Sequence, residues 1–190
     1  EEGLSFKNVV SFNLDEYLPM PKESEQSYHY FMHHHLFDHI DIDPKNIHIP
    51  DGTLKAEEIE NFCKEYERQI EAAGGIDIQV LGIGRTGHIG FNEPGSPLTS
   101  KTRMVYLDDL TIKDAAGDFG GMENVPSRAI TMGVGTIMKA RKVILLAWGE
   151  KKASIIKATV EGSVSDAVPA TFLQVHPNVQ FVIDESAAEE

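Results

Sequence analysis

Residues 81–97 read Leu-Gly-Ile-Gly-Arg-Thr-Gly-His-Ile-Gly-Phe-Asn-Glu-Pro-Gly-Ser-Pro. The apolar run at 76–83 predicts a buried strand that leads into this Gly-rich stretch. Glycines permit backbone conformations and close ligand approach that other residues resist. In an open α/β sheet, ligands bind beside loops that leave the carboxyl ends of strands. The stretch therefore predicts a ligand-binding loop after a strand, and a plain surface turn is the simpler alternative.

Two side chains in this loop are suited to proton transfer. His88 and Glu93 lie five positions apart, and Asn92 lies between them. A histidine titrates near neutral pH and is the commonest general acid or base, while a carboxylate can orient it. We therefore expect proton-transfer chemistry on a small polar substrate.

Strands and helices alternate along the chain. Strands are expected at 9–14, 76–83, 129–132, 142–148 and 179–183, and helices at 24–39, 57–73 and 150–160. Several of the strands are almost continuously apolar, which is typical of a parallel sheet covered on both faces. The sequence thus predicts an α/β, three-layer, Rossmann-like fold, with a mainly parallel sheet and helices on both faces. We expect one domain over 1–190, and both ends look cut, as in a fragment of a longer chain.

Composition narrows the class of partner. The 190 residues carry a formal net charge of −13, which argues against nucleic acid and anionic membrane surfaces. No apolar run reaches the ~18 residues that a membrane span requires, and no signal peptide opens the chain. The single cysteine, Cys63, excludes an intrachain disulfide and favours a reducing, cytoplasmic setting.

Two further positions are candidates for a site. Asp15 follows the first expected strand as His88 follows a later one, so parallel strands would bring both to one sheet edge. Asp15 is a candidate base, and capping of the next turn is the alternative. Lys151 and Lys152 open the helix expected at 150–160, where cations are unfavourable unless an anion docks there. Two solvated lysines are the simpler interpretation.

A histidine cluster raises the question of a metal. His35 and His39 stand at i and i+4, but no Glu follows His35 as in His-Glu-x-x-His. We interpret this cluster as a helix surface and expect no metal site.

Five motifs in order along the chain resemble glucosamine-6-phosphate deaminases, within the superfamily shared with 6-phosphogluconolactonases. The most specific is Gly-His-Ile-Gly-Phe-Asn-Glu-Pro at 87–94, because the lactonases share the Gly-His pair without the Phe-Asn-Glu-Pro continuation. The other four are Phe-Asn-Leu-Asp-Glu-Tyr at 12–17, Thr-Met-Gly-Val-Gly-Thr at 131–136, Val-Glu-Gly at 160–162 and Leu-Gln-Val-His-Pro at 173–177.

The resemblance implies conversion of glucosamine 6-phosphate and water to fructose 6-phosphate and ammonia. It implies that His88 opens the sugar ring, that Glu93 orients His88, and that Asp15 moves a proton between C2 and C1. It further implies that Lys152 contacts the phosphate, that the Gly82 backbone lies near the sugar, and that no cofactor is needed.

The chain also departs from the family pattern. Thr86 stands where an aspartate is usual, no arginine appears in the segment at 115–120, and the amino-terminal strand with its phosphate loop is missing. Two alternatives follow: a catalytically weakened sugar-phosphate-binding regulatory domain, and a lactonase-type hydrolase. The sequence leaves open a homo-oligomer and a fused domain in the full-length chain.

Overall fold

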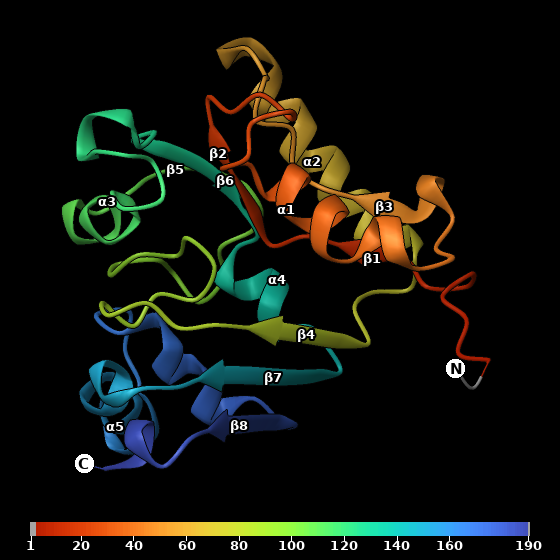
Figure 1. Cartoon of the computed structure of the whole chain (residues 1–190). Coiled ribbons are helices and arrows are strands. Elements are labelled where there is room, and N and C mark those ends of the chain that lie inside the picture. The colour runs from red at the N-terminus through yellow and green to blue at the C-terminus, as the bar shows by residue number, and fades with distance from the viewer. Residues whose placement is uncertain (1–2, 190) are drawn as a thin grey trace.

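The structure is a computed structural model that describes residues 3–189 (Figure 1). Its strands are β1 Ser11–Phe12, β2 Asp15–Leu18, β3 Ile47–His48, β4 Ile78–Leu81, β5 Arg103–Tyr106, β6 Arg128–Thr131, β7 Lys142–Ala147 and β8 Val179–Ile183. Its α-helices are α1 Tyr28–His35, α2 Ala56–Ala72, α3 Asp109–Ala115, α4 Val134–Met138 and α5 Ala153–Glu161. Short 3₁₀ turns join several of them, including Glu150–Lys152 directly before α5 and Pro169–Val175 before β8.

Strands β4, β7 and β8 form the expected parallel sheet, in the order β4-β7-β8. Their side chains alternate between a buried and an open face, as the pleat requires. Val143 and Leu145 of β7 are fully buried, whereas Ile78 and Val80 of β4 are 58% and 51% exposed. The three arrows in Figure 1 point toward the end where loop 82–97, α3 and α5 gather. The carboxyl ends of the three strands therefore lie on the same side of the molecule as the candidate loop.

One hydrophobic cluster joins this sheet to its helices. It contains Leu81 and Leu145 from the sheet, Tyr66 from α2, Ile137 from α4 and Ile156 from α5. At the start of helix α2, the Glu58 carboxylate accepts the N–H of Lys55, which satisfies one of the free N–H groups at the helix end. Burial of apolar surface at about 25 cal/mol per Å² holds these helices against the sheet.

A second sheet, antiparallel and in the order β2-β6-β5, is absent from the sequence prediction of one mainly parallel sheet. It packs its own cluster around Tyr17, Phe91 and Ala129. Because Phe91 lies in the loop after β4, this cluster ties the second sheet to the Gly-rich stretch. The α/β class is confirmed, with the two sheets meeting at that loop.

Two predicted elements depart most from the expected bounds. Of the strand expected at 9–14, only residues 11–12 are extended, as β1, which pairs parallel with β3. Strand β2 begins after the expected strand, at Asp15, and pairs antiparallel with β6. The helix expected at 24–39 is shorter, because Ser27 caps α1 by accepting the N–H of Tyr30, and the helix ends at His35.

Candidate active site

Loop 82–97 folds tightly around His88. The N–H of Gly84 donates to the carbonyl of His88 at 3.1 Å, and the N–H of Gly87 donates to the carbonyl of Gly84 at 3.0 Å. A Cβ at position 84 would lie 2.2 Å from the imidazole Nε2, so the ring packs directly against the Gly84 backbone. Glycine is required there because the histidine occupies the space that a side chain would fill.

A compact hydrogen-bond network surrounds Nδ1 of His88. Oε2 of Glu93 lies 3.1 Å from this nitrogen, the Thr86 hydroxyl 3.0 Å and the Thr111 hydroxyl 3.4 Å. The structure therefore brings together His88 and Glu93, which the sequence paired, and adds two threonines. Thr86 comes from the loop itself, whereas Thr111 comes from α3.

The proton positions in this network follow from its chemistry. Each threonine hydroxyl has one proton, and both donate to Glu93: Thr86 to Oε2 at 3.2 Å and Thr111 to Oε1 at 2.5 Å. Toward His88 they are therefore acceptors, like the carboxylate. We assign the ring proton to Nδ1, which leaves Nε2 as the atom that can exchange a proton with a substrate.

Glu93 is held in its charged form. Burial alone would raise its pKa, but hydrogen bonds from His88 and Thr111, the charge of His88 and the N–H of Asp108 outweigh burial and lower the pKa. An ionised Glu93 stabilises an imidazolium at His88 and fixes the ring orientation. This arrangement has the logic of a histidine oriented by a carboxylate.

Sequence reasoning missed Thr111, which is buried and whose helix α3 was not expected. Asp108 was the sequence feature that could have indicated this helix, because Asp is common at helix N-caps. In the structure its side chain accepts the N–H of Leu110 at the start of α3.

Asp15 begins β2 and pairs with Thr131 of β6 in the antiparallel register. The sequence argument placed Asp15 at the edge of a shared parallel sheet, and that route is wrong because its strand joins the second sheet. Asp15 nevertheless lies close to the His88 loop, as expected. A Cβ at Gly90, whose φ is +56°, would lie 3.3 Å from Oδ2 of Asp15 and 2.9 Å from Oγ1 of Thr131.

The Asp15 carboxyl is surrounded by protein, although the residue keeps partial access to solvent. Burial, reinforced by the neighbouring charge of Glu16, raises the pKa of Asp15 from 3.8 to about 7, and a hydrogen bond from the Phe91 backbone opposes the shift. A carboxyl with this pKa is suited to accept and return a proton near neutral pH.

Hydrogen bonds fasten the segment between His88 and Glu93 to the second sheet. The amide of Asn92, fully buried, donates to the carbonyls of Ile89 and Met132, each at 2.8 Å. Arg103 of β5 donates to the Asn92 side-chain oxygen at 2.9 Å and to the Ser96 hydroxyl at 3.2 Å. These bonds fix the backbone on which Glu93 is carried.

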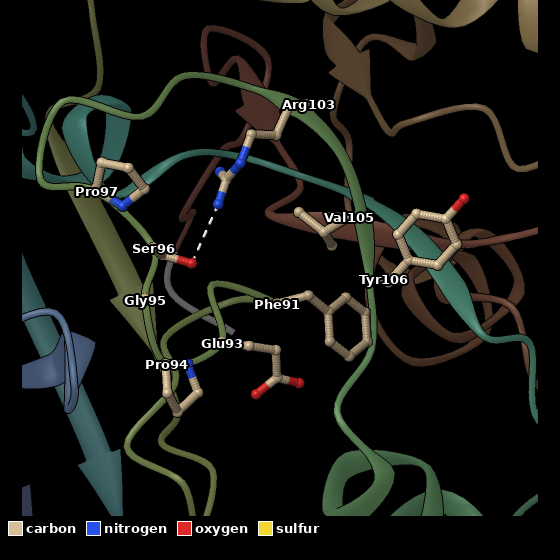
Figure 2. A pocket seen from close by; sticks show the side chains of 9 residues that line it. All are labelled: Phe91, Glu93, Pro94, Gly95, Ser96, Pro97, Arg103, Val105 and Tyr106. Atoms are coloured by element: carbon tan, nitrogen blue, oxygen red, sulfur yellow. Dashed lines mark hydrogen bonds between the residues drawn. The ribbon is translucent and has the colours of Figure 1, made fainter.

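Beside these bonds lies a cavity of about 320 Å³. Figure 2 shows Arg103 reaching toward Ser96 across a pocket whose other wall includes Glu93. The nine lining residues are Phe91, Glu93, Pro94, Gly95, Ser96, Pro97, Arg103, Val105 and Tyr106.

The two expected substrate contacts lie at the carboxyl end of β4. Nζ of Lys152 donates to the carbonyl of Ile83 at 2.6 Å, so the lysine leans over the start of the loop, while Lys151 is exposed. Burial, together with the charge of Arg85, lowers the pKa of Lys152, and Asp114 opposes this shift. Gly82 is exposed, and a Cβ there would meet nothing within 4 Å.

Within residues 3–189, no three His, Cys, Asp or Glu side chains are grouped so as to hold a metal ion. In the histidine cluster, His33 contacts Asp38 at 3.1 Å and His39 contacts the carbonyl of His34 at 2.8 Å. No helix in the same described part of the chain has the length and apolar character to cross a membrane.

Curated relatives match nearly the whole chain. A glucosamine-6-phosphate deaminase of Shewanella woodyi is 57% identical over 187 residues, covering 98% of this chain and 70% of that protein. A glucosamine-6-phosphate deaminase of Thermoanaerobacter pseudethanolicus is 51% identical, covering 97% of this chain and 72% of that protein. A deaminase-like protein of Bacteroides thetaiotaomicron is 52% identical, and there the chain spans only 28% of the relative's length.

Solved structures agree on the fold. A monomeric glucosamine-6-phosphate deaminase superposes with a TM-score of 0.95 at 40% identity, covering 99% of this chain and 77% of that one. A 6-phosphogluconolactonase of Trypanosoma brucei, at 22% identity, shares the fold with a TM-score of 0.71. The family model for glucosamine-6-phosphate isomerases and 6-phosphogluconolactonases matches residues 1–182. This chain belongs to the glucosamine-6-phosphate isomerase/6-phosphogluconolactonase family.

Proposed function

We propose that this chain catalyses aldose–ketose isomerisation with deamination, converting glucosamine 6-phosphate and water to fructose 6-phosphate and ammonia in amino-sugar catabolism. The observation that carries the proposal is a pair of proton-transfer groups that meet at one loop. Asp15, with its pKa raised to about 7, lies against Gly90 of the loop. His88 lies two residues before Gly90 in the same loop, and Glu93 orients it.

In the first step, His88 opens the sugar ring. Its Nε2 takes the proton of the C1 hydroxyl and delivers one to the ring oxygen as the bond between C1 and that oxygen breaks. Glu93 stabilises the transient imidazolium through Nδ1, which lies 3.1 Å from its Oε2. The product of this step is the open-chain aldehyde.

In the second step, Asp15 removes the proton from C2 while the substrate's own ammonium group gives a proton to O1, which yields an enolamine, and Asp15 then returns its proton to C1. The resulting imine at C2 adds water and releases ammonia, which leaves fructose 6-phosphate. A carboxyl with a pKa of about 7 is partly ionised at neutral pH, so it can serve as base and then as acid.

Binding of the phosphate is assigned to Lys152, and the backbone at Gly82 borders the sugar. The open space above Gly82 and the position of the Lys152 ammonium, 2.6 Å from the Ile83 carbonyl, support this placement at the end of β4.

The runner-up is a sugar-phosphate-binding regulatory domain with weakened catalysis. The observation that favours it is Thr86, which meets His88 with a hydroxyl and contributes no negative charge. Ammonia release from glucosamine 6-phosphate, together with its loss in Asp15→Asn and His88→Ala, separates the two. Saturable binding of the sugar phosphate without release would support the regulatory domain.

The proposal extends to the domain organisation and cellular location of the protein. We infer a single domain over 1–190 in a cytoplasmic protein, which fits the one buried thiol, Cys63. Light scattering on the full natural polypeptide would decide between a monomer and a homo-oligomer, and its sequence would show whether a further domain is fused.

A further inference from the structure

Two cations at the His88 loop, Arg85 and Lys152, lie within the electrostatic influence of one carboxylate, Asp114, which Arg85 alone bonds directly. Nε of Arg85 donates to Oδ2 of Asp114 at 2.9 Å, and a second guanidinium N–H donates to Oδ1, so the pair is two-pronged. Lys152 contacts the same loop and donates to the Ile83 carbonyl, two residues before Arg85. The charges of Arg85, Lys152 and His88 all help lower the pKa of Asp114. Arg85, Lys152 and Asp114 therefore lie close together beside the His88 loop.

The charges in this region do not balance. Arg85 and Lys152 contribute two positive charges, and Asp114 contributes one negative charge. The repulsion between the two cations adds to burial in lowering the pKa of Lys152. A dianionic group placed between them would relieve that repulsion, and it would match the two positive charges once Asp114 has left Arg85.

The Arg85–Asp114 pair is open to exchange. Both side chains are 42% exposed, and exposed ion pairs contribute little to stability. Asp114 takes two of the five N–H donors of the guanidinium, and Ile83 takes one of the three of the Lys152 ammonium. A guanidinium fork matches the oxygens of a phosphate as well as those of a carboxylate.

We propose that Arg85 is a substrate-binding residue for the phosphate monoester, which it holds together with Lys152 after leaving Asp114. Asp114 then competes with the phosphate for Arg85 and sets the affinity. This inference rests on the proposed function for the identity of the sugar phosphate. The competing interpretation is that Arg85 and Asp114 only fasten α3 to the loop.

The two interpretations predict opposite effects at Asp114. If Arg85 binds phosphate, Arg85→Gln weakens binding of fructose 6-phosphate at least tenfold, whereas Asp114→Asn frees Arg85 and tightens binding about two- to fivefold. If the pair only fastens α3, both variants weaken binding in the same direction. Arg141→Gln is the matched control, because Arg141 forms a comparable exposed pair with Asp77 away from the loop.

The experiment is calorimetric titration of the full natural polypeptide and the three variants with fructose 6-phosphate, and with fructose as the unphosphorylated probe. Opposite shifts for Arg85→Gln and Asp114→Asn with the phosphorylated sugar alone, and none for Arg141→Gln, support the inference. Parallel shifts, or an unchanged Kd in Arg85→Gln, overturn it. Binding is read without turnover, so a protein that binds through Arg85 but releases no ammonia refutes the proposed function alone.

Discussion

The hydroxyl of Thr86 lies 3.0 Å from Nδ1 of His88 and meets it as a hydrogen-bond acceptor, because its only proton is directed to Glu93. Thr86 thus adds a second hydrogen-bond acceptor for the imidazole N–H of His88, and its own proton stabilises the Glu93 carboxylate. Thr86, which we expect to replace an aspartate of the family pattern, is therefore part of the hydrogen-bond network around His88.

Replacing Thr86 with valine removes this hydroxyl at nearly constant volume. Because hydrogen bonds to charged groups contribute about 1.5–3 kcal/mol, we expect kcat/KM for ammonia release to fall about 10- to 100-fold. Thr86→Ser keeps the hydroxyl and should retain most activity. Equal activity in the valine and serine variants would show that the hydroxyl has no part in the reaction.

His88→Ala should abolish ring opening without unfolding the protein. General acid–base catalysis by one side chain contributes about 10²–10⁴-fold, so kcat should fall by at least two orders of magnitude. The thermal midpoint should stay close to that of the parent protein, because the ring packs on Gly84 at the edge of the core. A folded His88→Ala protein with full turnover would contradict its assigned role.

Gly84→Ala tests the position of the imidazole without removing a polar group. The added Cβ would lie 2.2 Å from Nε2 and must displace the ring. A displacement of about 1 Å can lower the rate about 100-fold, and we expect a loss of that order in kcat. Gly117→Ala is the control, since a Cβ there meets nothing within 4 Å. Similar kinetics in both variants would show that close packing of the His88 ring on Gly84 does not matter for the reaction.

The pH dependence should report Asp15. The base form is needed to take the proton from C2, and the pKa is raised to about 7. Below pH 7, kcat/KM should therefore fall about tenfold per pH unit, and above pH 7 it should level off on this limb. A profile that stays flat down to pH 5 would mean that Asp15 has an ordinary carboxyl pKa or is not the base.

The same shift predicts a pH-dependent gain in stability for Asp15→Asn. A folded pKa above the unfolded value of 3.8 means that ionisation of Asp15 destabilises the fold, and this cost grows between pH 4 and pH 7. At pH 8 the free energy of unfolding should be higher in Asp15→Asn by roughly 2–4 kcal/mol, and near pH 4 the difference should vanish. Denaturant unfolding at the two pH values measures it. A gain independent of pH would exclude the linkage.

Much of the fold could be predicted from apolar runs. The strand expected at 179–183 matches β8, and the run at 142–148 exceeds β7 by one residue. Strand β5 was missed because its residues are only half-buried or exposed, and its pairing with β6 gives no local signal. Helix α3 has seven residues, too few for a helical periodicity to stand out.

The site was predictable only in part. His88 and Glu93 lie in one loop, so their proximity follows from the sequence. Thr111 and Asp114 reach the same loop from α3, more than 20 positions away, through contacts that depend on tertiary packing. The role of Gly90, which lets the loop approach Asp15, likewise depends on β2 joining the second sheet.

The most direct test is ammonia release from glucosamine 6-phosphate by the full natural polypeptide, with fructose 6-phosphate measured in the same reaction. We predict equal amounts of the two products in the parent protein and loss of both in Asp15→Asn and His88→Ala. No release from a protein that binds the sugar phosphate, or release that persists in both variants, would contradict this assignment of the site.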